Sequence, residues 1–236
     1  ECIKTNINGA MNLVDCSIDR GVKKIVALST DKASSPINLY GATKLVSDKL
    51  FVAGNSYSGM QDTKFSVVRY GNVMGSRGSV IPLFKAQKKI GELSITDDRM
   101  TRFMITLEEA VQLVWTAFAD MCGGEIFVPK IPSMKVTDIA RLIAPGCKAK
   151  IIGQRPGEKM HEEMISVADA PNTFEGLKYY KILPHKEQAA RNKFNLDGFN
   201  PVENDFAYSS DNNKEWMSDH QFLEWYKSNS TKMLAI

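Results

Sequence analysis

The stretch Ile-Val-Ala-Leu-Ser-Thr-Asp-Lys-Ala-Ser-Ser-Pro-Ile-Asn-Leu-Tyr-Gly-Ala-Thr-Lys, residues 25–44, decides the fold of this chain. Its first four residues, 25–28, form a short apolar run, which predicts a buried strand of a parallel sheet. Polar residues 29–32 follow at the carboxyl end of that strand, where ligands bind in open α/β sheets. Pro36 keeps the connection from being helical, and we expect a helix to begin near Tyr40.

Tyr40 and Lys44 are spaced i, i+4, so they share one face of the predicted helix. An ammonium group near a phenol favours the phenolate. We therefore expect Lys44 to lower the pKa of Tyr40 and to make it an acid or base near neutral pH. In isolation such a pair is more often an aromatic ring packed on a lysine stem. Its position shortly after Ser-Thr-Asp-Lys, residues 29–32, favours a catalytic role.

A resemblance to a known family spans nearly the whole chain. It is carried, in order, by Leu28-Ser-Thr-Asp-Lys32, Tyr40-Gly-Ala-Thr-Lys44, Arg69-Tyr-Gly-Asn-Val73, Met100-Thr-Arg-Phe103, Gly123-Gly-Glu-Ile-Phe-Val-Pro129 and Arg155-Pro-Gly-Glu-Lys159. Together these blocks resemble the extended short-chain dehydrogenase/reductase family, and the Thr-Asp-Lys variant resembles its sugar-nucleotide 4,6-dehydratases. The resemblance implies a lyase of nonulosonic (pseudaminic) acid synthesis for surface or flagellin glycosylation. Such an enzyme uses NADP as cofactor and a UDP-sugar, UDP-N-acetylglucosamine, as substrate.

The same resemblance implies a role for each catalytic candidate. Tyr40 would take the proton of the C4 hydroxyl as hydride passes to NADP, with Thr30 hydrogen-bonded to that oxygen and Lys44 tuning Tyr40 and holding the nicotinamide ribose. Lys32 would then remove the C5 proton, and Asp31 would protonate the departing C6 hydroxyl. Retaining relatives carry Asp-Glu in place of Asp31-Lys32, and membrane-bound relatives carry methionine in place of Tyr40. The combination here matches the soluble, C5-inverting type, in which burial and nearby cations depress the pKa of the lysine.

Further residues are assigned to binding by the resemblance. The cofactor side would include Asn6, Tyr40, Lys44, Tyr70, Gly71, Val73 and Arg77. The substrate side would include Asn72, Thr96, Arg102, Arg155 and Glu158. Arginine offers a planar group of several donors that suits a diphosphate, and glycines let backbone N–H groups approach a ligand closely.

Each of these binding assignments has a structural alternative. Asn6 fits equally well as a polar residue in a first helical turn. The glycine-rich loop 70–78 and the block 154–159 fit surface turns without a ligand. Arg102 fits a structural arginine beside the acidic residues Asp97 and Asp98.

Strand and helix patterns alternate along the rest of the chain. Helices are predicted from Ile7 to Ile18, over 82–90, after the capping box of Thr106 and Glu109, over 137–144 and from 159 through Met164. Strands are predicted at 65–69 and 125–128, and a strand and a closing helix between Phe206 and Trp225. We expect an α/β fold, with half of a doubly wound parallel sheet, the NADP-binding Rossmann domain, in residues 1–132. A smaller C-terminal substrate-binding domain is expected in residues 133–236.

The chain contains no G-x-G-x-x-G motif after a strand. Gly71, Gly75 and Gly78 follow a strand but have the wrong spacing for a dinucleotide fingerprint. A doubly wound fold of this family needs a preceding βαβαβ half to hold the pyrophosphate of the cofactor. We therefore expect the chain to be a fragment that lacks this N-terminal half and that binds NADP weakly by itself.

Composition argues against several other classes of protein. A net charge of +3 with scattered basic residues does not favour nucleic acid as a partner. The cysteines form no C-x-x-C pair, which predicts reduced thiols and a cytoplasmic location. His161, His185 and His220 lack the spacing of metal ligands, and no apolar stretch is long enough to span a membrane. The family resemblance also implies that the protein forms a homo-oligomer.

Two other functions stay open at this level. A sugar-nucleotide 4-epimerase, or another sugar-nucleotide dehydratase, would share Tyr40 and Lys44, but an epimerase has no use for Asp31 and Lys32 as an acid/base pair. A non-catalytic, NADP-sensing relative would bind cofactor without turnover. A 4-keto-6-deoxy product would separate the dehydratase from both.

Overall fold

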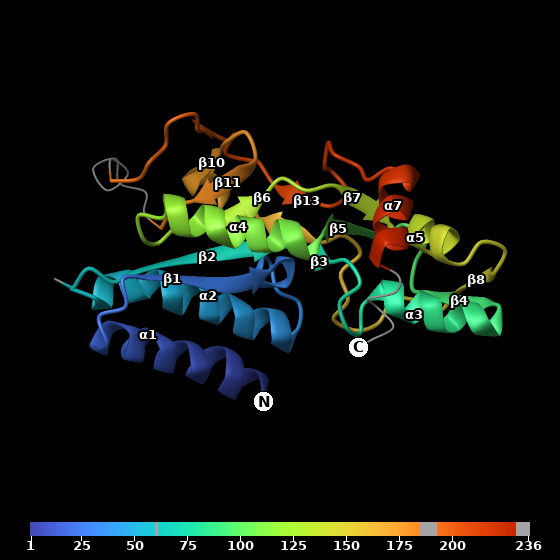
Figure 1. Ribbon diagram of the computed structural model, residues 1–236, viewed down its shortest axis with the longest axis horizontal. Helices are drawn as coiled ribbons and strands as arrows, with labels where there is room; N and C mark the ends of the chain where they lie inside the picture. The colour runs from blue at the N-terminus through green and yellow to red at the C-terminus, as the bar shows by residue number, and fades with distance from the viewer. Residues whose placement is uncertain (60, 185–192, 230–236) are drawn as a thin grey trace. The chain divides into compact units, whose positions relative to one another are not determined.

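The computed structural model describes residues 1–59, 61–184 and 193–229 (Figure 1). The chain divides into two compact units, each assembled from three stretches of sequence. The first, here the sheet unit, comprises Glu1–Tyr70, Glu108–Lys130 and Glu163–Tyr208, and the second unit comprises Gly71–Leu107, Ile131–Glu162 and Ser209–Ile236. These units do not coincide with the expected division between residues 132 and 133, because the chain leaves and re-enters each of them. Which part binds cofactor and which binds substrate stays a prediction.

The sheet unit is built on a six-stranded mixed sheet in the order β1-β2-β6-β11-β10-β12. Its parallel strands are β1 (Lys24–Thr30), β2 (Lys64–Tyr70) and β6 (Ile126–Pro129). Its antiparallel strands are β11 (Tyr179–Ile182), β10 (Thr173–Glu175) and β12 (Asn200–Pro201). The predicted α/β class is confirmed, but the sheet is parallel only over its first three strands. A hairpin turn at residues 176–178 joins β10 to β11, and a hairpin makes neighbouring strands antiparallel.

Helices cover both faces of the parallel strands. Beside β1 and β2 lie α1 (Gly9–Asp19), preceded by the π-helical turn η1 (Ile3–Asn8), and α2 (Leu39–Tyr57), while α4 (Leu107–Asp120) lies on the other face (Figure 1). Successive side chains of β2 alternate between these faces, as a strand requires. Phe65 packs against Phe51 of α2 with ring centroids 6.2 Å apart, and Val68 packs against α4.

The first strand is less buried than its apolar sequence predicts. β1 stands first in the order of the sheet, and Leu28 is 52% exposed. The strand itself is confirmed, as is the helix that follows it. Asn38 caps that helix by accepting a hydrogen bond from the Gly41 N–H at 2.8 Å.

An ion pair inside the sheet unit holds the antiparallel arm to α4. Lys181 of β11 is buried, and its Nζ lies 2.6 Å from Asp120 Oδ2 at the end of α4. The same ammonium donates to the carbonyl of Asn195 and lies 4.5 Å from the centre of the Phe199 ring. Because Asp120 neutralises its charge, Lys181 is tolerated in the middle of the sheet.

Among its described residues, the second unit contains two small sheets and three α-helices. One sheet has the order β3-β5-β7, formed by β3 (Asn72–Val73), β5 (Thr101–Ile105) and β7 (Ser133–Lys135), and the other pairs β4 (Glu92–Ile95) with β8 (Lys148–Ile151). Its helices are α3 (Val80–Gln87), α5 (Val136–Ile143) and α7 (Asp219–Asn229). A shared core of methionine, isoleucine and phenylalanine side chains holds these elements together, and Phe222 of α7 is fully buried in it. The predicted helices over 82–90 and 137–144 and the closing helix are confirmed.

One predicted helix is wrong. Residues 159 through Met164 do not form a helix; instead β9 (Glu163–Ile165) pairs with β13 (Tyr208–Ser209). The partner strand lies far away in the sequence, so local periodicity could not reveal the pairing.

Candidate active site

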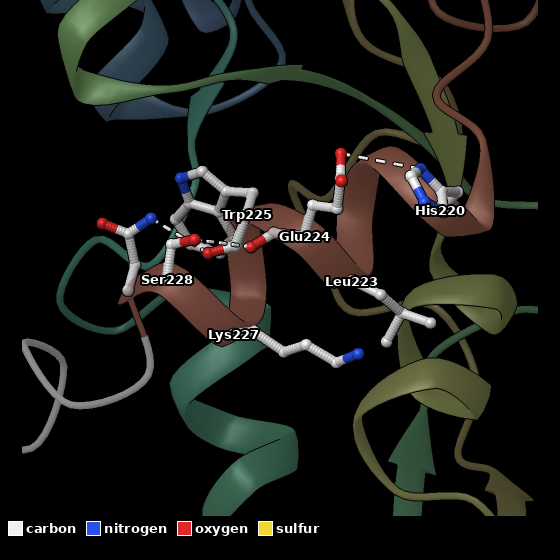
Figure 2. A pocket seen from close by; sticks show the side chains of 7 residues that line it. His220, Leu223, Glu224, Trp225, Lys227 and Ser228 are labelled. Carbon is white, nitrogen blue, oxygen red and sulfur yellow. Dashed lines mark hydrogen bonds and ion pairs between the residues drawn. The ribbon is translucent and has the colours of Figure 1, made fainter.

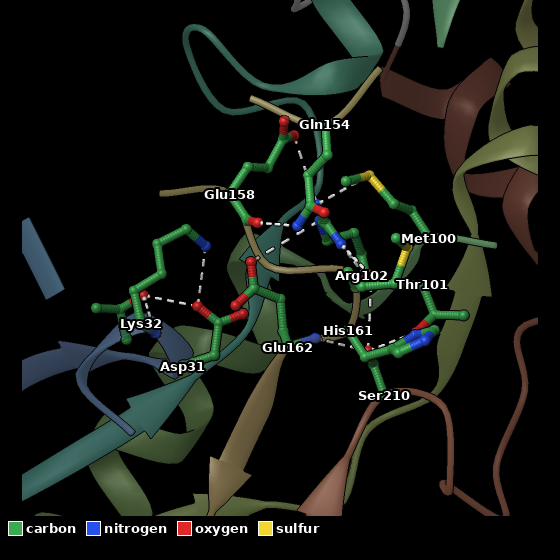
Figure 3. Close-up of polar contacts among 12 residues, drawn as sticks. Asp31, Lys32, Met100, Thr101, Arg102, Gln154, Glu158, His161, Glu162 and Ser210 are labelled. Carbon is green, nitrogen blue, oxygen red and sulfur yellow. Dashed lines mark hydrogen bonds and ion pairs between the residues drawn. The ribbon is translucent and has the colours of Figure 1, made fainter. Parts of the chain in front are cut away.

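The predicted catalytic residues Thr30, Asp31 and Lys32 lie where β1 ends, in the short 3-10 turn η2 (Asp31–Ala33). The Thr30 hydroxyl donates to Asp31 Oδ1 at 2.9 Å and accepts from the Lys32 N–H at 3.4 Å. Lys32 Nζ donates to the same Oδ1 at 3.1 Å (Figure 3). Asp31 is 1% exposed, and its Oδ2 is buried without a hydrogen-bond partner. Buried polar atoms without a partner are uncommon, and this carboxyl oxygen is suited to pair with a hydroxyl group of a substrate.

Tyr40 lies in the first turn of α2 and is 44% exposed. Burial raises the pKa of Tyr40, while the charge of Lys32 lowers this pKa and the charge of Asp31 raises it. The phenol therefore lies close to Asp31 and Lys32, and the structure brings these three predicted catalytic groups together. Tyr70 belongs to the same neighbourhood, since burial and then the charge of Tyr40 raise the pKa of Tyr70.

The expected effect of Lys44 on Tyr40 is wrong in this structure. Lys44 Nζ donates to the backbone carbonyl of Leu28 at 2.7 Å, and the cation that lowers the pKa of Tyr40 is Lys32. The net shift of the Tyr40 pKa is upward because desolvation exceeds the effect of Lys32. Helical spacing placed Lys44 on the correct face but could not show where its ammonium points.

The glycine of the Tyr-Gly-Ala-Thr-Lys block is required by packing. A Cβ at Gly41 would lie 2.3 Å from the carbonyl oxygen of Lys32 and 3.1 Å from Pro36 Cβ. The backbone of α2 therefore touches the backbone of the turn that carries Lys32. This close approach fixes the separation between Tyr40 and the residues at the end of β1.

Gly41→Ala is expected to lower the free energy of unfolding by about 1–3 kcal/mol, because the Lys32 backbone must move to admit a methyl group. Denaturant unfolding measures this change. Gly9→Ala is the matched control in another helix, since its Cβ would meet only the Lys4 carbonyl at 3.7 Å. An alanine at position 41 that is tolerated as well as one at position 9 would contradict the packing account.

The connection between Lys32 and Tyr40 is held by a residue that the sequence analysis missed. Glu163 Oε1 of β9 accepts hydrogen bonds from the Ser34 hydroxyl at 2.9 Å and the Ser35 hydroxyl at 2.6 Å. Ser35 has a φ of +40°, an uncommon conformation for a residue other than glycine. Nothing in the local sequence marks Glu163 for this role.

Two predicted cofactor residues, Asn6 and Lys44, line one cavity of about 280 Å³ within the sheet unit. The cavity lies between η1 with α1, strand β1 and helix α2. Asn6 Nδ2 donates to Thr43 Oγ1 at 3.0 Å, so the amide also ties η1 to α2. This contact supports a structural role for Asn6, and a role in cofactor binding stays a prediction.

The glycine-rich loop of the second unit begins with a glycine that packing demands. A Cβ at Gly71 would lie 2.5 Å from Phe103 Cβ, so this position is explained without a ligand. Val73 pairs with Ile105 in the β3-β5 ladder, and Arg77 is exposed. Asn72 Oδ1 is different, because it is buried and has no hydrogen-bond partner.

Arg102 lies in a dense cluster of the second unit (Figure 3). Its Nη1 donates to the carbonyls of Thr101 at 2.7 Å and Met160 at 3.0 Å. Its guanidinium also lies 3.7 Å from Glu158 Oε1 and 3.8 Å from Glu162 Oε1. The acidic loop expected beside Arg102 pairs with another arginine instead. Arg99 binds Asp97 at 2.8 Å and holds the pKa of that carboxyl well below its usual range.

The remaining substrate candidates of the second unit differ in exposure. Arg155 is exposed, and its carbonyl accepts a hydrogen bond from the Glu158 N–H at 3.1 Å in a tight turn. Glu158 Oε2 is buried and has no hydrogen-bond partner. Thr96 is partly buried just after β4. The small cavity lined by Asn72 and Arg102 measures about 10 Å³, enough for about one water molecule.

A hollow of about 730 Å³ holds none of the predicted site residues. All of its lining comes from α7 (Figure 2): His220, Leu223, Glu224, Trp225, Lys227, Ser228 and Asn229. His220 Nδ1 lies 3.5 Å from Glu224 Oε2 one helical turn away. A single exposed helix surface of this kind gives no sign of a binding site.

Histidine and cysteine side chains form no metal centre in the part of the chain that the structure describes, where no group of three or more His, Cys, Asp or Glu could hold an ion. His161 Nδ1 instead contacts Thr101 Oγ1 at 2.8 Å, and His185 lies outside the described residues. Within residues 1–59, 61–184 and 193–229, no helix is both long and apolar enough to cross a membrane.

Comparison with known proteins gives matches over most of the chain. Residues 1–184 match the family model described as "Polysaccharide biosynthesis protein". The chain is 54% identical over 231 residues to the UDP-N-acetylglucosamine 4,6-dehydratase (inverting) of Campylobacter jejuni, a match that covers 95% of this chain and 69% of that protein. It is 44% identical over 187 residues to the UDP-glucose 4-epimerase of Rickettsia canadensis, with 77% and 55% covered. The crystal structure of Pen from Bacillus thuringiensis superposes with a TM-score of 0.83 at 34% identity, covering 96% of this chain and 68% of that one.

Proposed function

We propose, on the premise that this chain belongs to the polysaccharide biosynthesis protein family, that it performs the chemistry of a C5-inverting UDP-N-acetylglucosamine 4,6-dehydratase. The chain is homologous to a dehydratase of that description, which removes water from its substrate. The observation that carries the proposal is the contact of Lys32 Nζ with Asp31 Oδ1 at 3.1 Å, close to the phenol of Tyr40.

The first proposed step is oxidation at C4 of the sugar. Tyr40 takes the proton of the C4 hydroxyl, and Thr30 hydrogen-bonds the same oxygen. NADP would supply the hydride acceptor for C4 and the hydride donor for C6. Tyr40 and Lys44 suit the nicotinamide ribose because both belong to the start of α2 at the carboxyl end of β1, the edge where ligands bind in this fold class. Lys32 assists Tyr40 because its charge favours the phenolate.

The second proposed step is removal of water across C5 and C6. The reaction needs a neutral lysine as base and a protonated carboxyl group as acid. Transfer of one proton within the Asp31–Lys32 pair supplies both forms, since the pair is in hydrogen-bond contact. Lys32 then gains the C5 proton while Asp31 gives its proton to the C6 hydroxyl, and the pair returns to its ionic form. The unpartnered Asp31 Oδ2 is the oxygen suited to meet that hydroxyl.

A sugar-nucleotide 4-epimerase is the second candidate function, because the Rickettsia relative bears that description. An epimerase would use Tyr40 and would leave the Asp31–Lys32 pair without a task. Mass spectrometry of the product formed from UDP-N-acetylglucosamine by the full-length protein tests the choice. A dehydratase releases a sugar nucleotide lighter by one water, whereas an epimerase leaves the mass unchanged.

The residues proposed to bind the substrate are Asn72, Thr96, Arg102, Arg155 and Glu158. Buried oxygens without partners on Asn72 and Glu158 support two of them. Arg102 already has carbonyl and carboxylate partners. To bind a phosphate it would have to use N–H donors that these partners leave unoccupied. The proposal further places the product in nonulosonic acid synthesis, in the cytoplasm, and expects a homo-oligomer.

Arg155→Ala is expected to raise KM about ten- to a hundredfold with little change in kcat. Arg155 is exposed, and a diphosphate contact would be equally strong in the ground state and the transition state. Steady-state kinetics with varied UDP-sugar measures both constants.

Arg99→Ala is the matched control for this prediction, because Arg99 is also an exposed arginine of the second unit but is engaged with Asp97. Its KM should equal that of the wild type. If Arg155→Ala also leaves KM unchanged, Arg155 does not belong to the substrate site.

A further inference from the structure

Two side chains of α2 are bonded to consecutive residues at the end of β1. Lys44 Nζ donates to the Leu28 carbonyl at 2.7 Å, and the Ser29 hydroxyl donates to Asp48 Oδ2 at 2.8 Å. Lys44 and Asp48 are one helical turn apart on the face that also presents Tyr40. These bonds therefore fix the helix that carries Tyr40 to the strand that delivers the Thr30–Lys32 turn.

Asp48 is the deeper of the two anchors. It is 1% exposed, and its Oδ2 also accepts from Arg69 Nη2 of β2 at 3.2 Å. Arg69 is equally buried, and its Nη1 donates to the Met164 carbonyl at 2.9 Å and lies 3.6 Å from Asp169 Oδ2. The arginine and hydroxyl partners favour the charged form of this buried carboxyl group.

The charged and polar groups around Asp48 come from three elements. Lys44 belongs to its own helix, Ser29 to β1 and Arg69 to β2. Asp169 lies near Arg69 and also accepts a hydrogen bond from the Ser166 hydroxyl. Burial raises the pKa of Asp48 above its ordinary value, and this effect exceeds the lowering by the charge of Arg69, the hydrogen bonds of Ser29 and Arg69, and the charge of Lys44. Burial lowers the pKa of Lys44 below its ordinary value, and the charge of Asp48 offsets part of this shift by raising it.

We propose that Asp48 is a positioning residue, whose buried carboxylate fixes α2 to the end of β1 and places a negative charge one helical turn from Lys44. Its importance for turnover rests on the proposed function, in which Lys44 serves the nicotinamide ribose. Asp48 itself touches neither substrate nor reacting atoms. It acts through Lys44 and Ser29.

The test measures the ionisation of Lys44 directly in the full-length protein. Competitive acetylation read by mass spectrometry gives the pH midpoint at which the Lys44 amine loses its proton. Asp48→Asn keeps the shape of the side chain and removes its charge, so this midpoint should move to lower pH. The alkaline limb of kcat should move in the same direction, whereas a merely structural role would lower kcat equally at every pH.

Two controls separate charge from hydrogen bonding. Ser29→Ala removes a bond to Asp48 and keeps the carboxylate, so the Lys44 midpoint should stay at its wild-type value while kcat falls less than about tenfold. Asp48→Glu retains the charge and should keep the midpoint near that of the wild type. A midpoint that moves as far in Ser29→Ala as in Asp48→Asn would overturn the proposal.

Asp48→Asn alone leaves the buried Arg69 without its closest carboxylate, which endangers folding. The double variant Asp48→Asn/Arg69→Gln removes both charges of the pair and should show the same downward shift of the Lys44 midpoint. An unmoved midpoint in this variant would refute the inference. Acetylation does not require turnover, so the two proposals can fail separately. A wild-type protein that makes no 4-keto-6-deoxy sugar would disprove the proposed function. The pH midpoint of Lys44 would still decide the role of Asp48.

Discussion

Replacing Lys32 with alanine is expected to slow the loss of water about 10²- to 10⁴-fold, the contribution of a general base, while oxidation at C4 continues. The reason is that Lys32 is proposed to act as a base only after C4 has become a ketone, whereas in the oxidation it contributes only its charge. The variant should therefore accumulate a 4-keto sugar that keeps its C6 hydroxyl, together with the absorbance of reduced nicotinamide. Mass spectrometry of the quenched reaction and absorbance spectroscopy measure the two species.

The same variant should also change the pH dependence of the oxidation. The charge of Lys32 lowers the pKa of Tyr40, so removing it raises that pKa. Oxidation depends on the phenolate, which forms above the pKa, and its rising limb should therefore move to higher pH. Lys32→Arg is the matched control, because arginine keeps the charge but does not act as a base near neutral pH. It should lose dehydration and keep the wild-type limb.

The role of Lys32 would be refuted by turnover of Lys32→Ala within a few-fold of the wild type. Simple pairing with Asp31 at 3.1 Å would then be its whole task. Dehydration that survives in Lys32→Arg would also contradict a base at this position.

Tyr40→Phe is expected to lower C4 oxidation about 10²- to 10⁴-fold, since it removes the group that takes the hydroxyl proton. Dehydration should fall with it, and no 4-keto sugar should accumulate. That pattern differs from the one expected for Lys32→Ala, in which the intermediate builds up. A single-turnover experiment that follows reduced nicotinamide makes the measurement.

Tyr57→Phe is the control for this second variant, because Tyr57 is an exposed tyrosine at the other end of the same helix. It should retain wild-type turnover. If Tyr40→Phe oxidises the substrate at a comparable rate, the acid/base role passes to another group.

Local signals in the sequence were sufficient for the elements that carry the site. The apolar run at residues 25–28 predicts the strand observed as β1, and the Pro36 connection with its following helix is observed with α2 beginning at Leu39. Both depend on periodicity, turn chemistry and a cap at Asn38, all of which act within a few residues.

Pairings between distant segments were not predictable in this way. The antiparallel strands β10 and β11, the strand β9 in place of a helix, and the interleaved units all depend on contacts with partners far along the chain. A three-residue strand such as Glu163–Ile165 has too little periodicity to distinguish it from a helical turn.

The site shows the same division between local and distant causes. The sequence pattern placed Asp31, Lys32 and Tyr40 in one catalytic group, and the structure brings them together. The pattern did not show that Lys32, and not Lys44, influences the phenol, since that depends on side-chain direction and burial. The supporting contact of Glu163 was missed because it joins Ser34 across 129 residues of sequence.

The most direct test of the central claim is the product formed by the full-length protein from UDP-N-acetylglucosamine and NADP in heavy water, analysed by mass spectrometry and NMR. The account predicts a UDP-4-keto-6-deoxy-hexosamine with deuterium at C5 and inverted configuration at that carbon, because solvent delivers the new proton to the face opposite the one from which Lys32 removed it. A C4 epimer of unchanged carbon skeleton and oxygen count, or a 4-keto-6-deoxy product that keeps its C5 configuration, would contradict it.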